Sequence, residues 1–65
     1  MKIRVNDEEV DIKADTISSL VSELGYDNKT IAIAKNEEFV PKGDYSSTKI
    51  LDGDRFDIVA PMQGG

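Results

Sequence analysis

The side chains that could carry chemistry in this sequence are almost all carboxylates. The chain of 65 residues has 13 acidic and 8 basic residues, and it contains no cysteine and no histidine. Thiol nucleophiles, disulfides, zinc sites built on cysteine or histidine, and Ser-His-Asp relays are therefore excluded. The glycines form neither a dinucleotide-binding pattern nor a Walker pattern. A self-sufficient enzyme is not expected from this composition.

The acidic segments of the chain fit known site patterns only in part. Asp52-Gly53-Asp54 with Asp57 resembles the start of a calcium loop, but Gln63 stands where a bidentate acid is required. Asp7-Glu8-Glu9 and Glu37-Glu38 fall at predicted turns, whereas acid–base catalysis needs carboxylates that converge in a pocket. We interpret these acids as a turn before a strand and as solvated surface, and expect neither a metal site nor a catalytic site.

The last two residues, Gly64 and Gly65, are a different kind of candidate. Glycine lacks a Cβ atom, so a Gly-Gly end can enter a narrow channel with backbone angles that other residues avoid. The α-carboxylate of Gly65 would then be within reach of another enzyme's active site. A carboxylate reacts only after one oxygen becomes a leaving group, so this chemistry requires ATP and a second protein. The alternative is a frayed terminus without function.

Alternation of apolar and polar residues predicts the strands that must support this tail. The expected strands cover residues 2–6, 10–12, 30–35, 39–40 and 55–60. The first two are expected to form a hairpin, and Pro41 ends the short fourth strand, as suits a sheet edge. In the last strand Phe56, Ile58 and Ala60 are expected to face inward. Residues 42–49 are polar and are expected to be irregular.

One helix is predicted between the second and third strands. Its apolar stripe consists of Ile17, Leu20, Val21 and Leu24. Asp15 or Thr16 can cap its start, and Gly25 suits a left-handed cap at its end. A helix with one apolar face must pack across a sheet. We therefore predict an α+β, β-grasp (ubiquitin-like) fold, with a mixed sheet of four to five strands and one main helix on one face. The predicted domain covers residues 1–61, and residues 62–65 are a flexible tail.

The charge of the chain restricts the kinds of partner. A formal net charge of −5 disfavours binding to nucleic acids and to anionic membranes, and it suits a basic partner. The longest apolar run, residues 31–34, is far shorter than the roughly 20 residues of a membrane span. The start of the sequence lacks an apolar leader segment. We expect a cytoplasmic protein that binds neither nucleic acid nor membranes.

An ordered set of segments points to a family. The set consists of Ile3-Arg4-Val5-Asn6, Thr16 with Leu20 and Leu24, Ile31-Ala32-Ile33-Ala34-Lys35-Asn36, Val40-Pro41, Leu51-Asp52-Gly53-Asp54, Ile58-Val59-Ala60-Pro61 and Gly64-Gly65. Over nearly its whole length the chain resembles the ThiS family, the small sulfur carriers of thiamine biosynthesis. This family belongs to a wider group that includes ubiquitin and the small subunits of molybdopterin synthase.

The resemblance implies a carrier that other enzymes act on. A ThiF-type adenylating enzyme would use ATP to convert the Gly65 carboxylate into an acyl-adenylate, and a cysteine desulfurase relay would replace AMP with sulfur. The Gly65 thiocarboxylate would then donate sulfur to thiazole synthase. Gly64, together with Gly65, would let the tail enter the narrow channel of a partner enzyme. The chain itself would bind no cofactor. The open alternatives are a carrier for molybdopterin or another sulfur pathway, a ubiquitin-like protein modifier, and an interaction module with an incidental Gly-Gly end.

Partner enzymes must also contact the folded part of the chain. We expect this contact on the sheet face away from the helix and near the tail. The candidate residues are Phe39, Val40, Val59 and Met62, with Asp54 and Asp57 at a polar rim.

Two departures from the family pattern concern the third turn and the end of the chain. Glu37-Glu38 follow Asn36 where the family often has glycine, so a different turn is expected. Met62-Gln63 stand where a small residue is usual, which leaves the identity of the partner open.

Overall fold

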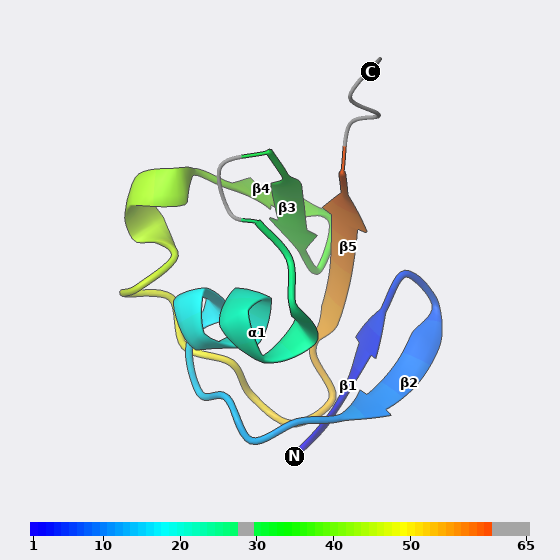
Figure 1. Ribbon diagram of the computed structural model, residues 1–65. Coiled ribbons are helices and arrows are strands. Elements are labelled where there is room, and N and C mark those ends of the chain that lie inside the picture. The colour runs from blue at the N-terminus through cyan, green and yellow to red at the C-terminus, as the bar shows by residue number, and fades with distance from the viewer. Residues whose placement is uncertain (28–29, 61–65) are drawn as a thin grey trace.

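A mixed sheet with a helix packed on one face forms the molecule, which is described by a computed structural model over residues 1–27 and 30–60. The elements within these ranges are β1 (Lys2–Val5), β2 (Glu8–Asp11), α1 (Ile17–Leu24), β3 (Ala32–Lys35), β4 (Glu38–Val40), the 3-10 helix η1 (Lys42–Asp44) and β5 (Arg55–Val59). The strands lie in the order β2-β1-β5-β3-β4 (Figure 1). This arrangement confirms the predicted α+β, β-grasp fold.

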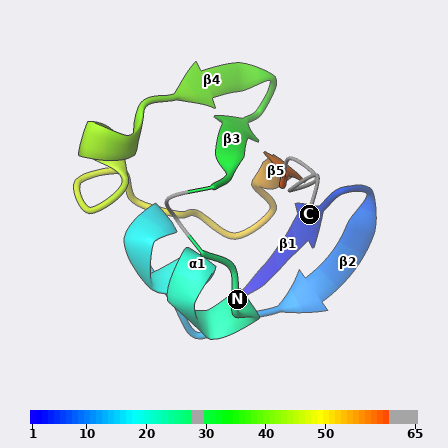
Figure 2. The same ribbon diagram turned by 45° about the horizontal axis from the view of Figure 1, so that its top comes forward.

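Strand β5 joins two hairpins that are local in the sequence. β1 pairs with β2 and β3 pairs with β4, in both cases antiparallel. β5 lies between the hairpins, parallel to β1 and antiparallel to β3, as Figure 2 shows. The sheet is therefore completed only when the strand nearest the carboxyl end has been inserted at its centre.

The helix begins and ends as the sequence predicts. Thr16, not Asp15, caps its start, since the Thr16 hydroxyl accepts a hydrogen bond from the Ser19 amide at 3.2 Å. Gly25 ends it with φ at 81°, the left-handed conformation that glycine adopts without steric cost. Over the described part of the chain no helix is long and apolar enough to cross a membrane.

The core lies between α1 and the sheet. Its most deeply buried large side chains are Ile3, Ile17, Leu20, Ile33 and Phe56. Tyr45 also belongs to it, with 3% of its surface exposed, although it lies in the segment 42–49 that was expected to be irregular. The prediction for Ala60 was wrong: this residue is exposed, because β5 ends at Val59, which pairs with Ala32 at the limit of the sheet.

Both hairpins turn through two residues with positive φ. The values are 52° and 69° for Asn6 and Asp7, and 50° and 72° for Asn36 and Glu37. Such turns match the twist of the flanking strands. Asn and Asp tolerate this conformation, but a glutamate does so at a steric cost. Glu37 therefore has a backbone conformation that glycine adopts without steric cost. This turn was expected to differ from the family pattern, but its backbone is of the kind that glycine favours.

Replacing Glu37 with glycine should stabilise the domain. Removal of the left-handed penalty outweighs the extra chain entropy of glycine in the unfolded state, so Glu37→Gly should raise the free energy of unfolding by about 0.5–1 kcal/mol. Urea denaturation measures this. The matched control, Glu37→Gln, removes the exposed 3.8 Å ion pair with Arg55 but keeps the strained backbone. Equal stability of the two variants would contradict the interpretation.

Candidate functional site

The strand that leads to the carboxyl end is fixed by asparagines from both hairpin turns. At the start of β5, the Asn36 side chain accepts a hydrogen bond from the Arg55 amide at 3.0 Å. The backbone N–H of Asn36 donates to the Arg55 carbonyl at 2.7 Å. Near the end of β5, the Asn6 side chain accepts from the Ile58 amide at 2.8 Å and donates to its carbonyl at 3.1 Å. These bonds hold β5 near both of its ends.

Asp54, which was expected at a polar rim, is buried instead. Only 8% of this residue is exposed. Its carboxylate accepts hydrogen bonds from the Leu51 amide at 2.8 Å and from the Asn36 side chain at 3.2 Å. The Lys35 ammonium lies 3.6 Å away. Burial alone would raise the pKa of Asp54, but these hydrogen bonds and the Lys35 charge outweigh it, so the pKa lies below its usual value.

The turn before β5 is also tied to β1. The Asp52 carboxylate accepts a hydrogen bond from the Lys2 amide at 2.8 Å, and the Gly53 amide donates to the Lys2 carbonyl at 2.8 Å. Gly53 has φ at 90°. These contacts confirm the turn interpretation of this acidic segment. The residues in the described ranges contain no group of three or more acids that could hold a metal ion.

An apolar patch lies on the sheet face opposite α1, near the end of β5. Cross-strand neighbours point to the same face of a sheet. Ala34 lies opposite Phe39 on one side and opposite Asp57 on the other. Ala32 lies opposite Val59. Phe39 and Val59 are 66% and 61% exposed. We call Ala32, Ala34, Phe39 and Val59 the outer patch.

The predicted contact residues divide between this patch and the core. Phe39 and Val59 are exposed on the expected face. The placement of Val40 was wrong: it is 8% exposed and lies opposite Ile33 in the core. Successive side chains of a strand point to opposite faces, so an outward Phe39 requires an inward Val40. Met62 lies outside the described residues.

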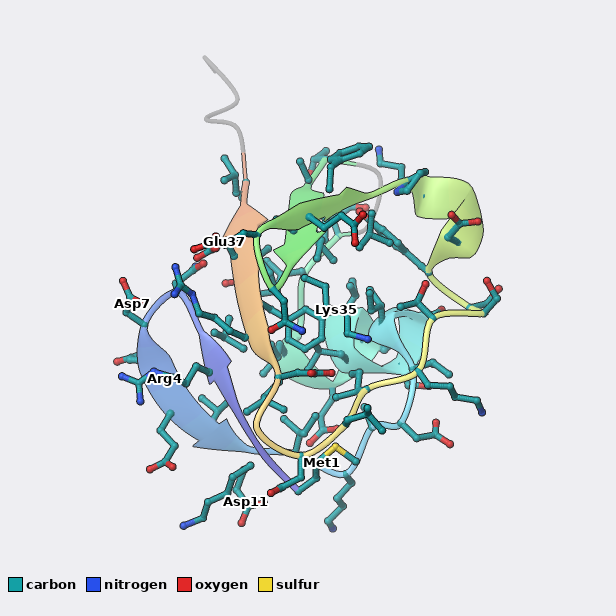
Figure 3. The ribbon with its side chains drawn as sticks, turned by 180° about the vertical axis from the view of Figure 1, so that it is seen from behind. Met1, Arg4, Asp7, Asp11, Lys35 and Glu37 are labelled. Atoms are coloured by element: carbon teal, nitrogen blue, oxygen red, sulfur yellow. The ribbon has the colours of Figure 1, made fainter. Side chains whose placement is uncertain are left out.

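Charged side chains surround the outer patch. Asp57 is half-buried beside Ala34. Towards β1, Arg55 lies next to Arg4 in the parallel pairing, and Arg4 points away from the helix (Figure 3). These two arginines were not among the residues predicted for a site. Their common face follows from the β1–β5 register, which no local pattern reveals. Glu9 lies opposite Arg4 on the same face, and the Glu37 carboxylate lies 3.8 Å from the Arg55 guanidinium, so the outer face has an apolar end and an end of mixed charge.

The family model named ThiS family matches residues 3–65. The chain belongs to the ThiS family. This assignment confirms the resemblance that the ordered segments indicated.

Known proteins similar to this ThiS-family chain include a curated relative and solved structures. A protein named thiazole synthase, from Paramagnetospirillum magneticum, is 41% identical over 66 residues, which cover 100% of this chain and 20% of that protein. The chain thus spans about a fifth of the length of this relative.

The solved structures agree with the fold. The crystal structure of the thiamine biosynthesis protein ThiS from Geobacter metallireducens has a TM-score of 0.84 at 23% identity, covering 100% of both chains. A solution structure of a thiamine biosynthesis protein from the same organism also has a TM-score of 0.84, at 22% identity, covering 100% of this chain and 88% of that one. At this level of identity the likeness shows the shared fold alone.

The tail of this ThiS-family chain lies outside the described residues. This applies to Gly64 and Gly65 and to the predicted division into a domain of residues 1–61 and a tail of residues 62–65. Their roles stay predictions.

Neutralising Asp54 should destabilise the domain at neutral pH. Because its pKa is lowered on folding, ionised Asp54 stabilises the native state above the unfolded-state pKa of about 3.9. This stabilisation disappears as the pH falls through the folded-state pKa. Asp54→Asn should lower the free energy of unfolding at pH 7 by about 1.5–3 kcal/mol, the usual range for charged hydrogen bonds.

Urea denaturation at pH 7 and at successively lower pH values tests this. The difference between Asp54→Asn and the native chain should shrink as the pH falls below about 3.9. Asp57→Asn on the outer face is the control and should change the free energy of unfolding by less than about 0.5 kcal/mol at every pH. If Asp54→Asn is less stable than the native chain by the same amount at every pH, the charge of Asp54 does not cause the loss of stability.

Proposed function

We propose that this chain is a sulfur carrier of thiamine biosynthesis that bears sulfur as a thiocarboxylate on Gly65. The observation that carries the proposal is the ThiS family match, which continues to residue 65 in a chain without cysteine. A carrier without a thiol side chain must hold sulfur on another group, and the α-carboxylate of Gly65 is the group that the family pattern supplies.

The proposed chemistry has three steps and takes place on partner enzymes. An oxygen of the Gly65 carboxylate attacks the α-phosphorus of ATP and releases pyrophosphate, which gives an acyl-adenylate. A persulfide sulfur of the relay then attacks the carbonyl carbon and displaces AMP, which gives an acyl disulfide. A further thiol reduces this disulfide, leaving the thiocarboxylate on Gly65 and a disulfide on the relay protein. The chain supplies the carbonyl group and acts as a substrate, not as an enzyme.

The outer patch is the proposed contact for the ThiF-type adenylating enzyme. Exposed Val59 is the last residue of β5, and exposed Phe39 lies on β4 in the same row as Asp57. An enzyme that covers both is therefore close to the end of the strand that leads to the tail. Arg4 and Arg55 extend this surface with polar groups, Arg4 opposite Glu9 and Arg55 paired with Glu37. The buried Val40 is not part of the proposal.

Thiazole synthase is the proposed sulfur acceptor. A protein with that name contains a segment 41% identical to this whole chain, and the segment makes up 20% of its length. A carrier-like segment within one polypeptide with a synthase supports a functional link between the two. We propose that the carrier acts in the cytoplasm, where ATP and cysteine-derived sulfur are available, and without a cofactor of its own.

Mass spectrometry of the intact chain tests the sulfur-carrier role. Incubation with a ThiF-type adenylating enzyme, ATP and a persulfide donor should increase the mass by the difference between sulfur and oxygen. A thiol-directed alkylating reagent should then give one adduct, which methionine oxidation cannot mimic in a chain without cysteine. Deletion of Gly65 should abolish the adduct and leave the fold intact. Conjugates on lysine side chains of other proteins, without an adduct, would instead indicate a protein modifier.

Truncation of the outer patch should weaken recognition by the adenylating enzyme. Phe39→Ala and Val59→Ala should each raise the KM for the carrier by about tenfold, as expected for a buried interface contact, with little change in kcat. Pyrophosphate release measures both constants. Leu51→Ala is the matched control, because Leu51 is 64% exposed but lies outside the patch. Unchanged KM values in both patch variants would place the contact elsewhere.

A further inference from the structure

Strand β2 leaves hydrogen-bonding groups open along one margin of the sheet. Met1 and Ile12 exchange hydrogen bonds of 2.8 and 3.2 Å, which fixes the alternation of the β1–β2 ladder. In this alternation Val10 faces β1 through its backbone, whereas the N–H and C=O groups of Glu9 and Asp11 point away from β1. Within residues 1–27 and 30–60, no hydrogen bond engages these outward backbone groups.

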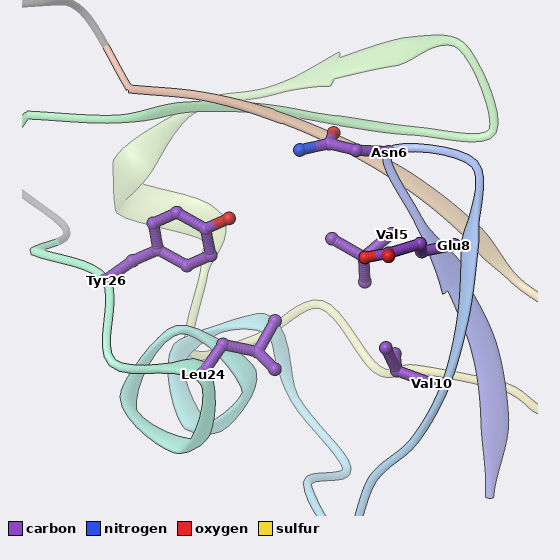
Figure 4. A pocket seen from close by; sticks show the side chains of 6 residues that line it. All are labelled: Val5, Asn6, Glu8, Val10, Leu24 and Tyr26. Carbon is purple, nitrogen blue, oxygen red and sulfur yellow. The ribbon is translucent and has the colours of Figure 1, made fainter.

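A cavity of about 170 Å³ lies beside this margin, on the helix side of the sheet. Its lining residues are Val5, Asn6, Glu8, Val10, Leu24 and Tyr26. Figure 4 shows Leu24 and Tyr26 on one side of the cavity and the hairpin residues Val5, Glu8 and Val10 on the other. The walls are more apolar than polar, and Glu8, the first residue of β2, adds a carboxylate. We call the cavity and the outward backbone of Glu9 and Asp11 the edge groove.

The opposite margin of the sheet is less open. β4 is three residues long, and Pro41, which has no N–H group, follows it directly. Short edge strands that end in proline are a common protection against strand addition. The edge groove therefore is the better candidate for pairing with another extended segment.

The charges of β2 select the kind of segment that can pair. In a symmetric antiparallel pairing of two copies about Val10, Glu9 of one copy would lie opposite Asp11 of the other. Like charges in opposite positions destabilise strand pairs. On the β1 side, Arg4 lies opposite Glu9 and Lys2 lies opposite Asp11, and the Met1 ammonium is 3.3 Å from the Asp11 carboxylate. A cation on the free side would therefore place each acid between positive charges. This pattern opposes self-association and favours a basic strand.

We propose that the edge groove binds an extended segment of a partner protein in which an apolar side chain lies between basic ones. The segment pairs with the backbone of Glu9 and Asp11 as an added strand. Its residue opposite Val10 points to the helix side and fills the cavity, while its neighbours point to the outer side, beside the Glu9 and Asp11 carboxylates. The proposal does not depend on the sulfur chemistry, and it concerns a different margin of the sheet from the outer patch.

Nuclear magnetic resonance of the full labelled chain tests this. The probe is a short capped peptide in which one leucine lies between lysines, in a background of threonine. We expect amide shifts at Glu9, Asp11, Leu24 and Tyr26, and slower hydrogen exchange of the Asp11 amide. A peptide with glutamate in place of lysine should give no shifts. Shifts confined to the outer patch, or none at millimolar lysine peptide, would overturn the proposal.

Matched variants at one position separate backbone pairing from charge. Glu9→Pro removes an outward N–H group that the fold does not use, so it should fold and bind the lysine peptide about tenfold more weakly. Glu9→Gln keeps this N–H group and should weaken binding by only about two- to threefold at low salt. Thermal unfolding verifies that both variants fold. Equal affinity of Glu9→Pro and Glu9→Gln would overturn the pairing.

A second variant keeps the proposal testable if Glu9→Pro does not fold. Tyr26→Ala changes the far wall of the cavity and leaves β2 intact. It should remove the preference for the leucine peptide over the same peptide with alanine in its place. An unchanged preference would show that the apolar side chain does not enter the cavity.

Discussion

The structure depends on the insertion of β5 between two hairpins that could each form locally. β1–β2 and β3–β4 do not pair with each other, and β5 connects them by pairing with β1 on one side and β3 on the other. Asn6 and Asn36 secure this insertion. Each lies in a hairpin turn with a left-handed backbone and directs its side chain to the backbone of β5. The turn residues thereby hold the hairpins to the strand that unites them.

The parts of the fold that follow local rules could be predicted from the sequence. The helix stripe, the cap at Gly25 and the turn before β5 each depend on residues a few positions apart. The burial of Asp54 could not be predicted in this way, because its partner Asn36 lies 18 residues away in the sequence. Tyr45 gave no periodic signal, since it enters the core from an irregular segment.

The candidate site was also predictable only where local sequence patterns determine it. Phe39 and Val59 were recognised as surface residues, but Val40 was assigned to the same face although strand alternation places it inward. The adjacent arginines on the outer face depend on the parallel β1–β5 register, which has no local sequence signal. The Gly-Gly end is visible in the sequence, and its role depends on partner enzymes that the fold does not specify.

The two surfaces proposed for binding suit a protein that is handed from one enzyme to another. The outer patch lies on the open face of the sheet over β3, β4 and β5, whereas the edge groove lies between α1 and the β1–β2 hairpin. Their character also differs, since the patch is formed by apolar side chains and the groove carries the carboxylates of Glu8, Glu9 and Asp11. One partner can therefore hold the domain while another covers the outer face.

The central position of β5 also determines how the domain responds to mechanical load. A partner that draws the carboxyl end into a deep active site pulls along the axis of β5. Hydrogen bonds to β1 and β3 lie across this axis on both sides, so the pull shears many of them together. A terminal strand at the margin of the sheet would instead peel away one bond at a time. The parallel β1–β5 pair therefore lets the domain act as a rigid handle that withstands traction on the chain end.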